Sequence, residues 1–316
     1  MRQKTQIIYM GTPDFSVPAL QKLAAQDDFH VSLVITQPDR PRGRGKRLLP
    51  SPVKMAAMNL GIDVFQPEDI NTQNAKEKLL SLNPDFFVVA AFGQILSRKI
   101  LNIPTVLPIN IHASLLPRYR GASPVQAAIL NMDDITGITT MVMAQKMDAG
   151  DLLLSASTRI AEQDTAQDLT DRLGLIGADL IVETLHAVLD NRLNPTPQDH
   201  SKATYVKLLQ KDNGRIDWTL SSRQICAHIN AMTPWPGAFT HLGKKSLKIF
   251  KALPSDIKAC HEPGVIFLCD NHGIHVATGN GSLKIQELMG SSGKRLTARQ
   301  FLCGNKIDFP VKFDPA

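Results

Sequence analysis

Two polar side chains stand two residues apart at the end of an apolar run: Asn110 and His112, in the stretch PINIHASLLPRYRG. In a β-strand, residues two apart point to the same side, so the amide and the imidazole would project together while Ile109 and Ile111 pack into the protein. An amide can donate a hydrogen bond to a developing oxyanion, and an imidazole can exchange a proton near neutral pH. By itself, such a pair more often consists of two polar residues that satisfy each other at a strand end.

A carboxylate completes the set 36 residues after His112. Asp148, in MDAGD, follows the apolar run TTMVM at the start of a glycine-containing turn. If the two strands are neighbours, Asp148 can orient His112 and stabilise its charge, while Asn110 donates to the oxyanion of a tetrahedral intermediate. The set contains no nucleophile of its own. The pattern therefore predicts acyl transfer in which an amine of the substrate attacks and its proton is taken up through His112.

These residues need strands that end at the same edge of a sheet. The first half of the chain alternates apolar runs, among them QIIYM, VSLVI, FFVVAA and PINI, with helical stretches. This alternation is typical of an α/β domain with a doubly wound, mostly parallel sheet. In such sheets ligands bind beyond the carboxyl ends of the strands, where Asn110 and His112 fall. The turn MGTPDF after the first strand lacks GxGxxG, which argues against a dinucleotide-dependent dehydrogenase.

A second, smaller domain is expected in the last third of the chain. The helical stretch 165–191 would close a catalytic domain of residues 1–191, and the polar, proline-containing segment 192–206 is typical of a linker. Residues 207–316 contain five short β-like runs between turn signals: GAFTHL, SLKIFKAL, GVIFLC, GIHVAT and SLKIQEL. Five short strands favour a small OB-like β-barrel, a fold often used to bind nucleic acids.

Composition excludes several classes of protein. The 316 residues are 43% hydrophobic, enough for two cores, yet the longest apolar run has only seven residues, at 86–92. A bilayer span needs roughly 20. Because the start of the chain also lacks the pattern of a signal peptide, we expect a cytoplasmic protein. We also expect a monomer. The four cysteines form no CxxC pair and no zinc-ligand spacing, so we expect no metal.

Positive charge is concentrated at the C-terminal end. The net charge of the whole chain is +6, but residues 205–316 carry 15 Lys and Arg against 8 Asp and Glu, a net charge of +7. A basic second domain beside a nearly neutral first one suggests a polyanionic partner, although a solvated basic surface is as common an explanation.

The stretch HASLLPRYRGASPVQAAIL and the later TGITTMVMAQKMDAGD together resemble the signature of folate-dependent formyltransferases: N-x-H, then SLLP, then a distal D-x-G. The resemblance implies that Asn110, His112 and Asp148 are the catalytic residues and that 10-formyltetrahydrofolate is the co-substrate. It also implies folate contacts in the segment Ser114, Leu115, Leu116 and Pro117. The chain departs from the family pattern at residues 143–146, MAQK, outside the catalytic three.

Two residues at the end of FFVVAAFG are further candidates for the folate pocket. Phe92 and Gly93 follow a predicted central strand, and a glycine there allows the close approach of a ligand to the main chain. The alternative is that they simply end a core strand.

The acceptor of the formyl group is suggested by residues 36–54, TQPDRPRGRGKRLLPSPVK. Residues 39–54 contain six basic residues, Lys54 included, and their two glycines and three prolines predict an irregular, flexible loop. Arginines can present planar donors to phosphates and bases. The loop resembles the insertion that some formyltransferases apply to the acceptor stem of tRNA. The resemblance implies transfer to methionine carried by initiator tRNA, with tRNA contacts at Arg40, Arg42, Arg44, Lys46 and Arg47.

Two alternatives remain open. A nucleotide-sugar N-formyltransferase would share the catalytic residues, but such enzymes lack a comparable basic run. A non-catalytic RNA-binding protein would keep the basic regions, yet it would be free to lose Asn110, His112 or Asp148. Family members that formylate a ribonucleotide resemble only the first domain, so the length of the chain argues against that acceptor.

Overall fold

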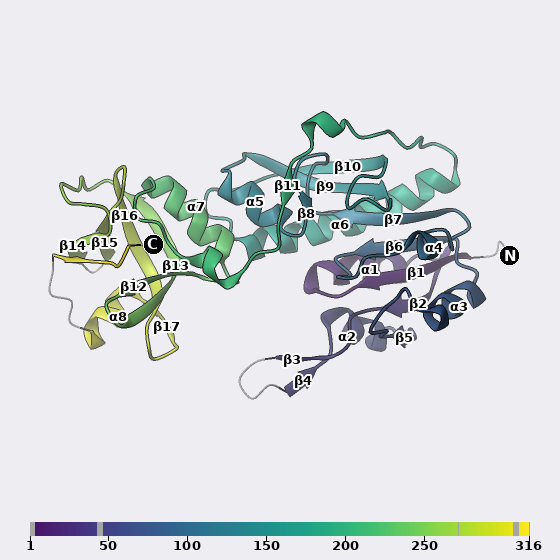
Figure 1. The fold of residues 1–316 in the computed structure, drawn as a ribbon, viewed down its shortest axis with the longest axis horizontal. Coiled ribbons are helices and arrows are strands. Elements are labelled where there is room, and N and C mark those ends of the chain that lie inside the picture. Colours follow the sequence, from purple (N-terminus) through teal and green to yellow (C-terminus); the bar gives the residue numbers. More distant parts are fainter. Residues whose placement is uncertain (1–3, 43–46, 271, 306–309, 316) are drawn as a thin grey trace. The chain divides into compact units, whose positions relative to one another are not determined.

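The structure is a computed structural model that describes residues 4–42, 47–270, 272–305 and 310–315. The chain forms two compact units (Figure 1). The first unit consists of Met1–Gly121, Ile135–Thr158 and Thr170–Val206, and the second of Ala122–Asp134, Arg159–Leu169 and Lys207–Ala316. The second unit therefore combines the C-terminal third of the chain with two short stretches from earlier in the sequence.

The first unit is built on one seven-stranded sheet, with the strand order β10-β9-β7-β6-β1-β2-β5. The strands are β1 (Thr5–Gly11), β2 (Phe29–Ile35), β5 (Val64–Phe65), β6 (Phe86–Ala90), β7 (Leu107–His112), β9 (Ile135–Val142) and β10 (Leu152–Arg159). The pairs from β5 through β2, β1 and β6 to β7 are parallel, whereas β9 runs antiparallel to β7. The predicted doubly wound, mostly parallel sheet is confirmed.

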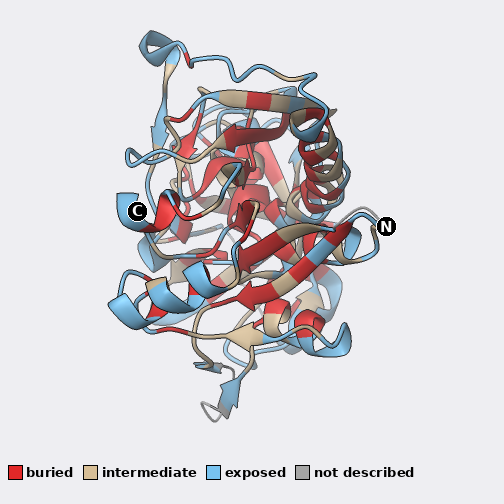
Figure 2. Ribbon diagram, turned by 90° about the vertical axis from the view of Figure 1, so that its right-hand side faces the viewer, coloured by how far each residue is buried: buried red, intermediate tan, exposed pale blue. Residues whose placement is uncertain are grey.

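Helices cover both faces of this sheet. They are α1 (Val17–Ala24), α2 (Pro52–Asn59), α3 (Gln73–Ser81), α4 (Arg98–Leu101) and α6 (Ala166–Leu189), with the short 3₁₀ helices η1 (Asp14–Ser16) and η2 (His200–Lys202). Apolar residues of α3 and α4 share a core with Ile8, Phe87 and Val89 on one face. On the other face α6 packs closely, since a Cβ added at Gly177 would lie 3.0 Å from Ile111. Strands β1, β2, β6 and β9 are buried along most of their length, whereas β10, at the edge of the sheet, is largely accessible (Figure 2).

The basic segment at residues 36–54 contains regular structure, which its proline and glycine content did not predict. β3 (Arg40–Arg42) pairs antiparallel with β4 (Arg47–Leu49), and Pro41 stands opposite Leu48. A proline lacks an N–H donor, but a two-stranded ribbon has free edges at which that donor is not needed. The prediction of an irregular loop was wrong for these two strands, which we call the β3–β4 hairpin.

The second unit is built on a curled antiparallel sheet with the path β12-β13-β16-β15-β14-β18, and β17 pairs with β16. Its strands are β12 (Ala238–Leu242), β13 (Lys245–Ser255), β14 (Val265–Asp270), β15 (Gly273–Ala277), β16 (Ser282–Met289), β17 (Arg295–Thr297) and β18 (Val311–Lys312). The helices of this unit are α5 (Pro124–Leu130), η3 (Lys211–Gly214), α7 (Ser222–Met232) and α8 (Ala298–Gly304). All five predicted strands are present, in accord with the predicted barrel-like second domain.

One short parallel pair lies outside both sheets. β8 (Arg120–Gly121) pairs with β11 (Tyr205–Val206), so the segment that follows α6 returns to the turn after β7. Residues 192–206, predicted to be a linker, form this returning segment, which we call the strap. None of the helices in the described part of the chain is long and apolar enough to cross a bilayer.

Candidate active site

The predicted pair Asn110 and His112 lies at the carboxyl end of β7, between β6 and β9. Ile109 and Ile111 are 0% and 3% exposed and fill the opposite face of the sheet, as strand alternation requires. His112 is buried, whereas Asn110 is only half-buried. Among the described residues, the side-chain amide of Asn110 has no hydrogen-bond partner. It is therefore free to donate to a bound substrate.

The ring of His112 is held from both sides. Its Nε2 atom lies 2.9 Å from the carbonyl oxygen of Tyr119, and its Nδ1 atom lies 3.7 Å from Oδ2 of Asp148. Because a carbonyl oxygen can only accept, Nε2 carries a hydrogen. Nδ1 is consequently the ring atom that can gain or lose a proton, and it does so facing a carboxylate.

Asp148 occupies a constrained turn after β9. Its main chain is in the left-handed region, with φ at +50°, and its side chain is only 12% exposed. Oδ2 accepts the main-chain N–H of Gly121 at 2.7 Å, and the Asp148 carbonyl accepts Nε2 of Gln198 at 2.9 Å. Because β7 and β9 are neighbours, the carboxylate reaches the imidazole as the sequence predicted.

The segment predicted to touch folate is anchored by Thr139 on β9. The Thr139 hydroxyl donates to the carbonyl of Ser114 at 2.7 Å and accepts the N–H of Leu116 at 3.2 Å. Ser114 is fully buried, and its own hydroxyl donates to the Arg118 carbonyl at 2.6 Å. Leu115 and Pro117 are half-buried. The segment is therefore a fixed turn that directly follows His112, with Leu115 and Pro117 as its more accessible side chains.

Phe92 and Gly93 play different parts in the structure. The ring of Phe92 is 2% exposed and belongs to the core under α3 and α4, which supports the alternative of a core strand end for this side chain. Its carbonyl accepts the hydroxyl of Thr12 at 2.8 Å. Gly93 is exposed, and its φ of +88° is a conformation that favours glycine. Of the two, Gly93 is the one that presents an open main chain at this strand end.

Of the five basic residues predicted to contact tRNA, Arg40 and Arg42 lie in β3 and Arg47 lies in β4. Arg40 is exposed, and its guanidinium donates to the side chain of Gln37 at 3.0 Å. Arg42 and Arg47 stand opposite each other in the register of the two strands. Arg44 and Lys46 lie outside the described residues.

The root of this hairpin is fixed by one carboxylate. Asp39 accepts Nζ of Lys54 at 2.7 Å and Nε2 of Gln66 at 2.8 Å. These hydrogen bonds, that from Gln66 first and that from Lys54 second, lower the pKa of the Asp39 carboxyl below its ordinary value. Lys54, one of the six cations counted in this segment of the sequence, is thus already paired.

Several residues around His112 and Asp148 were not identified from the sequence. Tyr119 and Gly121 act through main-chain groups, which leave no trace in residue type. Gln198 and Arg120 act through side chains, but Gln198 stands in a polar segment of ordinary linker composition. The glycine at position 121, after Arg-Tyr-Arg, can be seen in the sequence, and its φ of +114° explains why a glycine occurs there.

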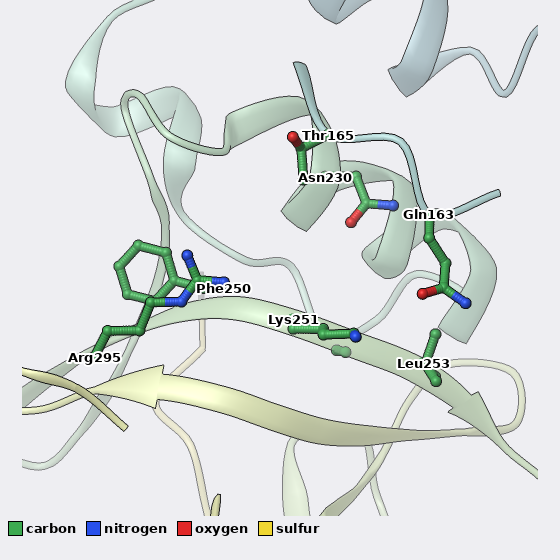
Figure 3. Close-up of a pocket in the computed structure, with 8 residues that line it drawn as sticks. Gln163, Thr165, Asn230, Phe250, Lys251, Leu253 and Arg295 are labelled. Atoms are coloured by element: carbon green, nitrogen blue, oxygen red, sulfur yellow. The ribbon is translucent and has the colours of Figure 1, made fainter. Parts of the chain in front are cut away.

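A separate pocket of about 160 Å³ lies within the second unit (Figure 3). It is lined by Gln163, Thr165, Asn230, Phe250, Lys251, Ala252, Leu253 and Arg295. Arg295 covers the ring of Phe250 and is paired with Glu287 at 2.6 Å, and the amide of Asn230 donates to the carbonyl of Glu162. The pocket contains none of the predicted catalytic residues and no histidine or carboxylate in its lining.

Metal ligands and cysteines give no second candidate centre. Within the described ranges, no group of three or more His, Cys, Asp or Glu side chains is arranged to hold a metal ion. The four cysteines are free thiols, with Cys226 buried, Cys269 half-buried, and Cys260 and Cys303 exposed.

Comparison with known proteins shows to which family the chain belongs. The formyl transferase family model matches residues 3–185, and the model for the C-terminal domain of formyl transferases matches residues 208–306. Among solved structures, an N-formyltransferase from Helicobacter canadensis, in complex with folinic acid and dTDP-3-aminofucose, aligns with a TM-score of 0.67 at 20% identity. The alignment covers 90% of this chain and 99% of that one. At this identity, the likeness shows the fold alone.

Curated relatives are much more similar in sequence. The methionyl-tRNA formyltransferase of Citrifermentans bemidjiense is 44% identical over 302 residues, which are 96% of this chain and 94% of the relative. The methionyl-tRNA formyltransferase of Agathobacter rectalis is 42% identical over 96% of this chain and 97% of the relative. Both domains match the family models, and the similarity extends over nearly the full length. The chain therefore belongs to the methionyl-tRNA formyltransferase family of enzymes.

Proposed function

We propose that the enzyme transfers the formyl group of 10-formyltetrahydrofolate to the amino group of methionine carried by initiator tRNA, using Asn110, His112 and Asp148. The sequence identity of over 40% to curated methionyl-tRNA formyltransferases supports methionyl-tRNA as the acceptor. The observation that carries the proposed site is the arrangement at the end of β7, where the Asn110 amide, without a partner among the described residues, lies beside an imidazole that faces a half-buried carboxylate.

The reaction joins the amine nitrogen to the formyl carbon and breaks the bond between that carbon and N10 of the folate. Asn110 donates a hydrogen bond to the formyl oxygen, which becomes negative in the tetrahedral intermediate, and this bond lowers the energy of the transition state. Nδ1 of His112 receives the proton that the attacking amine loses, and N10 takes up one proton as it leaves. Asp148 stabilises the imidazolium while it exists.

The folate co-substrate would lie against the turn formed by Ser114, Leu115, Leu116 and Pro117. This turn begins directly after His112, so a ligand on it reaches the catalytic edge of the sheet. Gly93 supplies an exposed main chain just after the neighbouring strand β6, and Phe92 supports that strand end from the core. These residues fit a flat, partly apolar group with polar edges.

The tRNA contacts belong to the β3–β4 hairpin and the basic C-terminal region. Arg40, Arg42, Arg44, Lys46 and Arg47 supply five cations within eight positions, and residues 205–316 have a net charge of +7. Residues 1–191 would form the catalytic domain, 192–206 the connection, and 207–316 the basic domain. The enzyme we propose is monomeric and cytoplasmic and uses no metal.

The deciding experiment supplies the purified protein with 10-formyltetrahydrofolate and one of three acceptors: methionyl initiator tRNA, methionyl elongator tRNA, or a nucleotide-linked amino sugar. We expect formyl-methionine with the first acceptor. Formylation of the sugar without formylation of the tRNA would identify a sugar N-formyltransferase instead. Binding of tRNA without any formyl product would favour the non-catalytic RNA-binding protein.

A chelator and an ultracentrifuge test the remaining parts of the proposal. Full activity after dialysis against EDTA is expected, and a loss restored by one divalent metal would contradict the metal-free mechanism. Sedimentation at micromolar concentration should give the mass of a single chain, and a dimer would contradict the monomer.

A further inference from the structure

The strap contributes a buried glutamine to the turn that carries Asp148. Nε2 of Gln198 donates to the carbonyl of Asp148 at 2.9 Å and to the carbonyl of Gly150 at 2.7 Å. Gln198 is 6% exposed, so water does not replace these bonds readily. Both carbonyls belong to one tight turn, in which a Cβ added at Gly150 would come within 1.8 Å of the Val142 carbonyl. The Gln198 amide therefore binds two carbonyl groups of one closely packed turn.

The orientation of the Gln198 amide is set by an arginine. Oε1 of Gln198 accepts two hydrogen bonds from Arg120, from Nε at 3.1 Å and from Nη2 at 2.6 Å. An inverted amide would direct its NH₂ group at the guanidinium, where only an acceptor fits. Arg120 thus fixes which end of the amide faces Asp148.

Arg120 is itself a buried cation, with 1% exposure. Besides Gln198 it donates to the hydroxyl of Tyr205 at 3.1 Å and to Nδ1 of His200 at 3.0 Å. All these acceptors are uncharged, which is a costly environment for a guanidinium because burial removes its hydration. The three side chains that accept from Arg120 all lie in the strap, so the strap is built around this one side chain.

We propose that Gln198 and Arg120 are positioning residues for formyl transfer, and that the strap is part of the catalytic machinery. The inference rests on the function proposed above. Gln198 holds the main chain of Asp148 at its left-handed φ of +50°, a conformation that is less favourable than the right-handed one for a residue with a Cβ. That main chain directs the carboxylate at Nδ1 of His112. Neither Gln198 nor Arg120 touches the reacting atoms.

The test uses Gln198→Glu. A glutamate at this position still accepts both bonds from Arg120, and their opposite charges keep the strap in place, but it donates nothing to Asp148 or Gly150. We expect kcat to fall about 10- to 100-fold, because small misplacements of a catalytic group have large effects on rate. The KM values for folate and for charged tRNA should change less than about two-fold. The matched control is Gln26→Glu, a half-buried side chain after α1 that donates to one main-chain carbonyl, that of Lys22, and should leave both constants unchanged.

A double-mutant cycle separates positioning from general damage. In an Asp148→Ala background, Gln198→Glu should reduce kcat by less than about two-fold further, because the group through which it acts is gone. An equal fold-loss in both backgrounds, or a wild-type kcat for Gln198→Glu, overturns the inference. Absence of formyl transfer by the wild-type protein would instead overturn the proposed function, so the two failures are distinguishable.

A second variant covers the case in which Gln198→Glu does not fold. Arg120→Lys keeps the positive charge but loses the pair of hydrogen bonds that Nε and Nη2 donate to Oε1 of Gln198. We expect a lower kcat with KM values near those of the wild type, whereas Arg192→Lys, at an exposed position of the strap, should behave as the wild type. If neither Gln198→Glu nor Arg120→Lys folds, the pair is a structural anchor and the inference fails.

Discussion

Gly121 donates its main-chain N–H at 2.7 Å to Oδ2 of Asp148, the same oxygen that lies 3.7 Å from Nδ1 of His112. One carboxylate oxygen therefore receives a donor from the turn after β7 and faces the imidazole of β7 itself. The adjacent Tyr119 carbonyl accepts Nε2 of His112. Tyr119 and Gly121 thus help to orient His112 and Asp148 through main-chain groups.

Gly121→Ala should impair both the fold and the activity. The φ at Gly121 is +114°, and an added Cβ would lie 2.2 Å from the Val206 carbonyl, so β8 and β11 must separate. We expect a loss of about 1–3 kcal/mol in the free energy of unfolding and a marked fall in kcat. Thermal unfolding and steady-state kinetics measure the two effects. In the control, Gly61→Ala, the φ is also positive, but among the described residues the added Cβ would meet no atom within 4 Å beyond its chain neighbours, so kcat should be unchanged.

Asn110→Ala should reduce kcat about 10²- to 10³-fold, as expected for the loss of an oxyanion donor. The side chain is half-buried and unpartnered among the described residues, so the substitution leaves no protein group unsatisfied and stability should change little. Kinetics with saturating folate and tRNA test the effect. Asn59→Ala, at an exposed site on α2, is the matched control. Wild-type turnover by Asn110→Ala would exclude the proposed role of the amide.

Replacing Arg42 and Arg44 together by Gln should raise the KM for tRNA and leave the KM for folate unchanged. Each lost phosphate contact should also reduce the slope of log(kcat/KM) against log[salt] by about one unit. The defect is therefore largest at low salt. Assays between low and physiological ionic strength measure this slope, with the double replacement of Arg98 and Lys99 by Gln on α4 as a charge-matched control. A similar loss of folate affinity would mean that the hairpin serves the folate site.

The contribution of Asp39 to stability should depend on pH. Hydrogen bonds from Gln66 and Lys54 lower the pKa of this carboxyl in the folded protein, so its stabilising effect is complete above the unfolded pKa of about 4 and is lost as the pH falls through the folded value. The wild type should therefore be more stable than Asp39→Asn at pH 7, and the difference should shrink below pH 4. Urea unfolding of the wild type and of Asp39→Asn, at pH 7 and at a pH below 4, measures the difference in the free energy of unfolding. A difference that does not vary with pH would contradict the ionic role.

The thiols should differ widely in reactivity. Burial, with a smaller effect of Glu162, raises the pKa of Cys226 to about 12, and its Sγ contacts the Ala252 carbonyl. Because the thiolate is the reactive form, Cys226 should resist alkylation at pH 8 while the exposed Cys260 and Cys303 react. Mass spectrometry after a short iodoacetamide treatment, with and without denaturant, identifies the modified residues. Rapid labelling of Cys226 in the native protein would show that α7 opens readily.

The features that the sequence predicted correctly are those that the local pattern of apolar and polar side chains determines. Alternation along residues 108–112 predicted a strand with Asn110 and His112 on one face, and the apolar run 86–92 predicted a central strand beside it. Five of the strands in the second unit were likewise visible as short apolar runs between turn residues. These features follow from burial on one face of a sheet, a local property of the sequence.

The unpredicted features depend on contacts between distant residues. Gln198 looked like part of a linker because its partners, Asp148 and Arg120, are 50 and 78 positions away. The β3–β4 hairpin was missed because proline and glycine content argued against strands, yet a free edge tolerates Pro41. Main-chain donors such as Gly121 leave no signal in residue type beyond the glycine itself.

The return of the strap to Asp148 has a consequence for the order in which the enzyme is made. A growing chain contains Asn110, His112 and Asp148 well before it contains Gln198 and β11. At synthesis rates of about 5–20 residues per second, roughly 3–12 s pass between the addition of Asp148 and that of Val206. A nascent chain shorter than this therefore has every catalytic side chain but not the segment that holds Asp148, and it acquires its complete site only after translation has passed the strap.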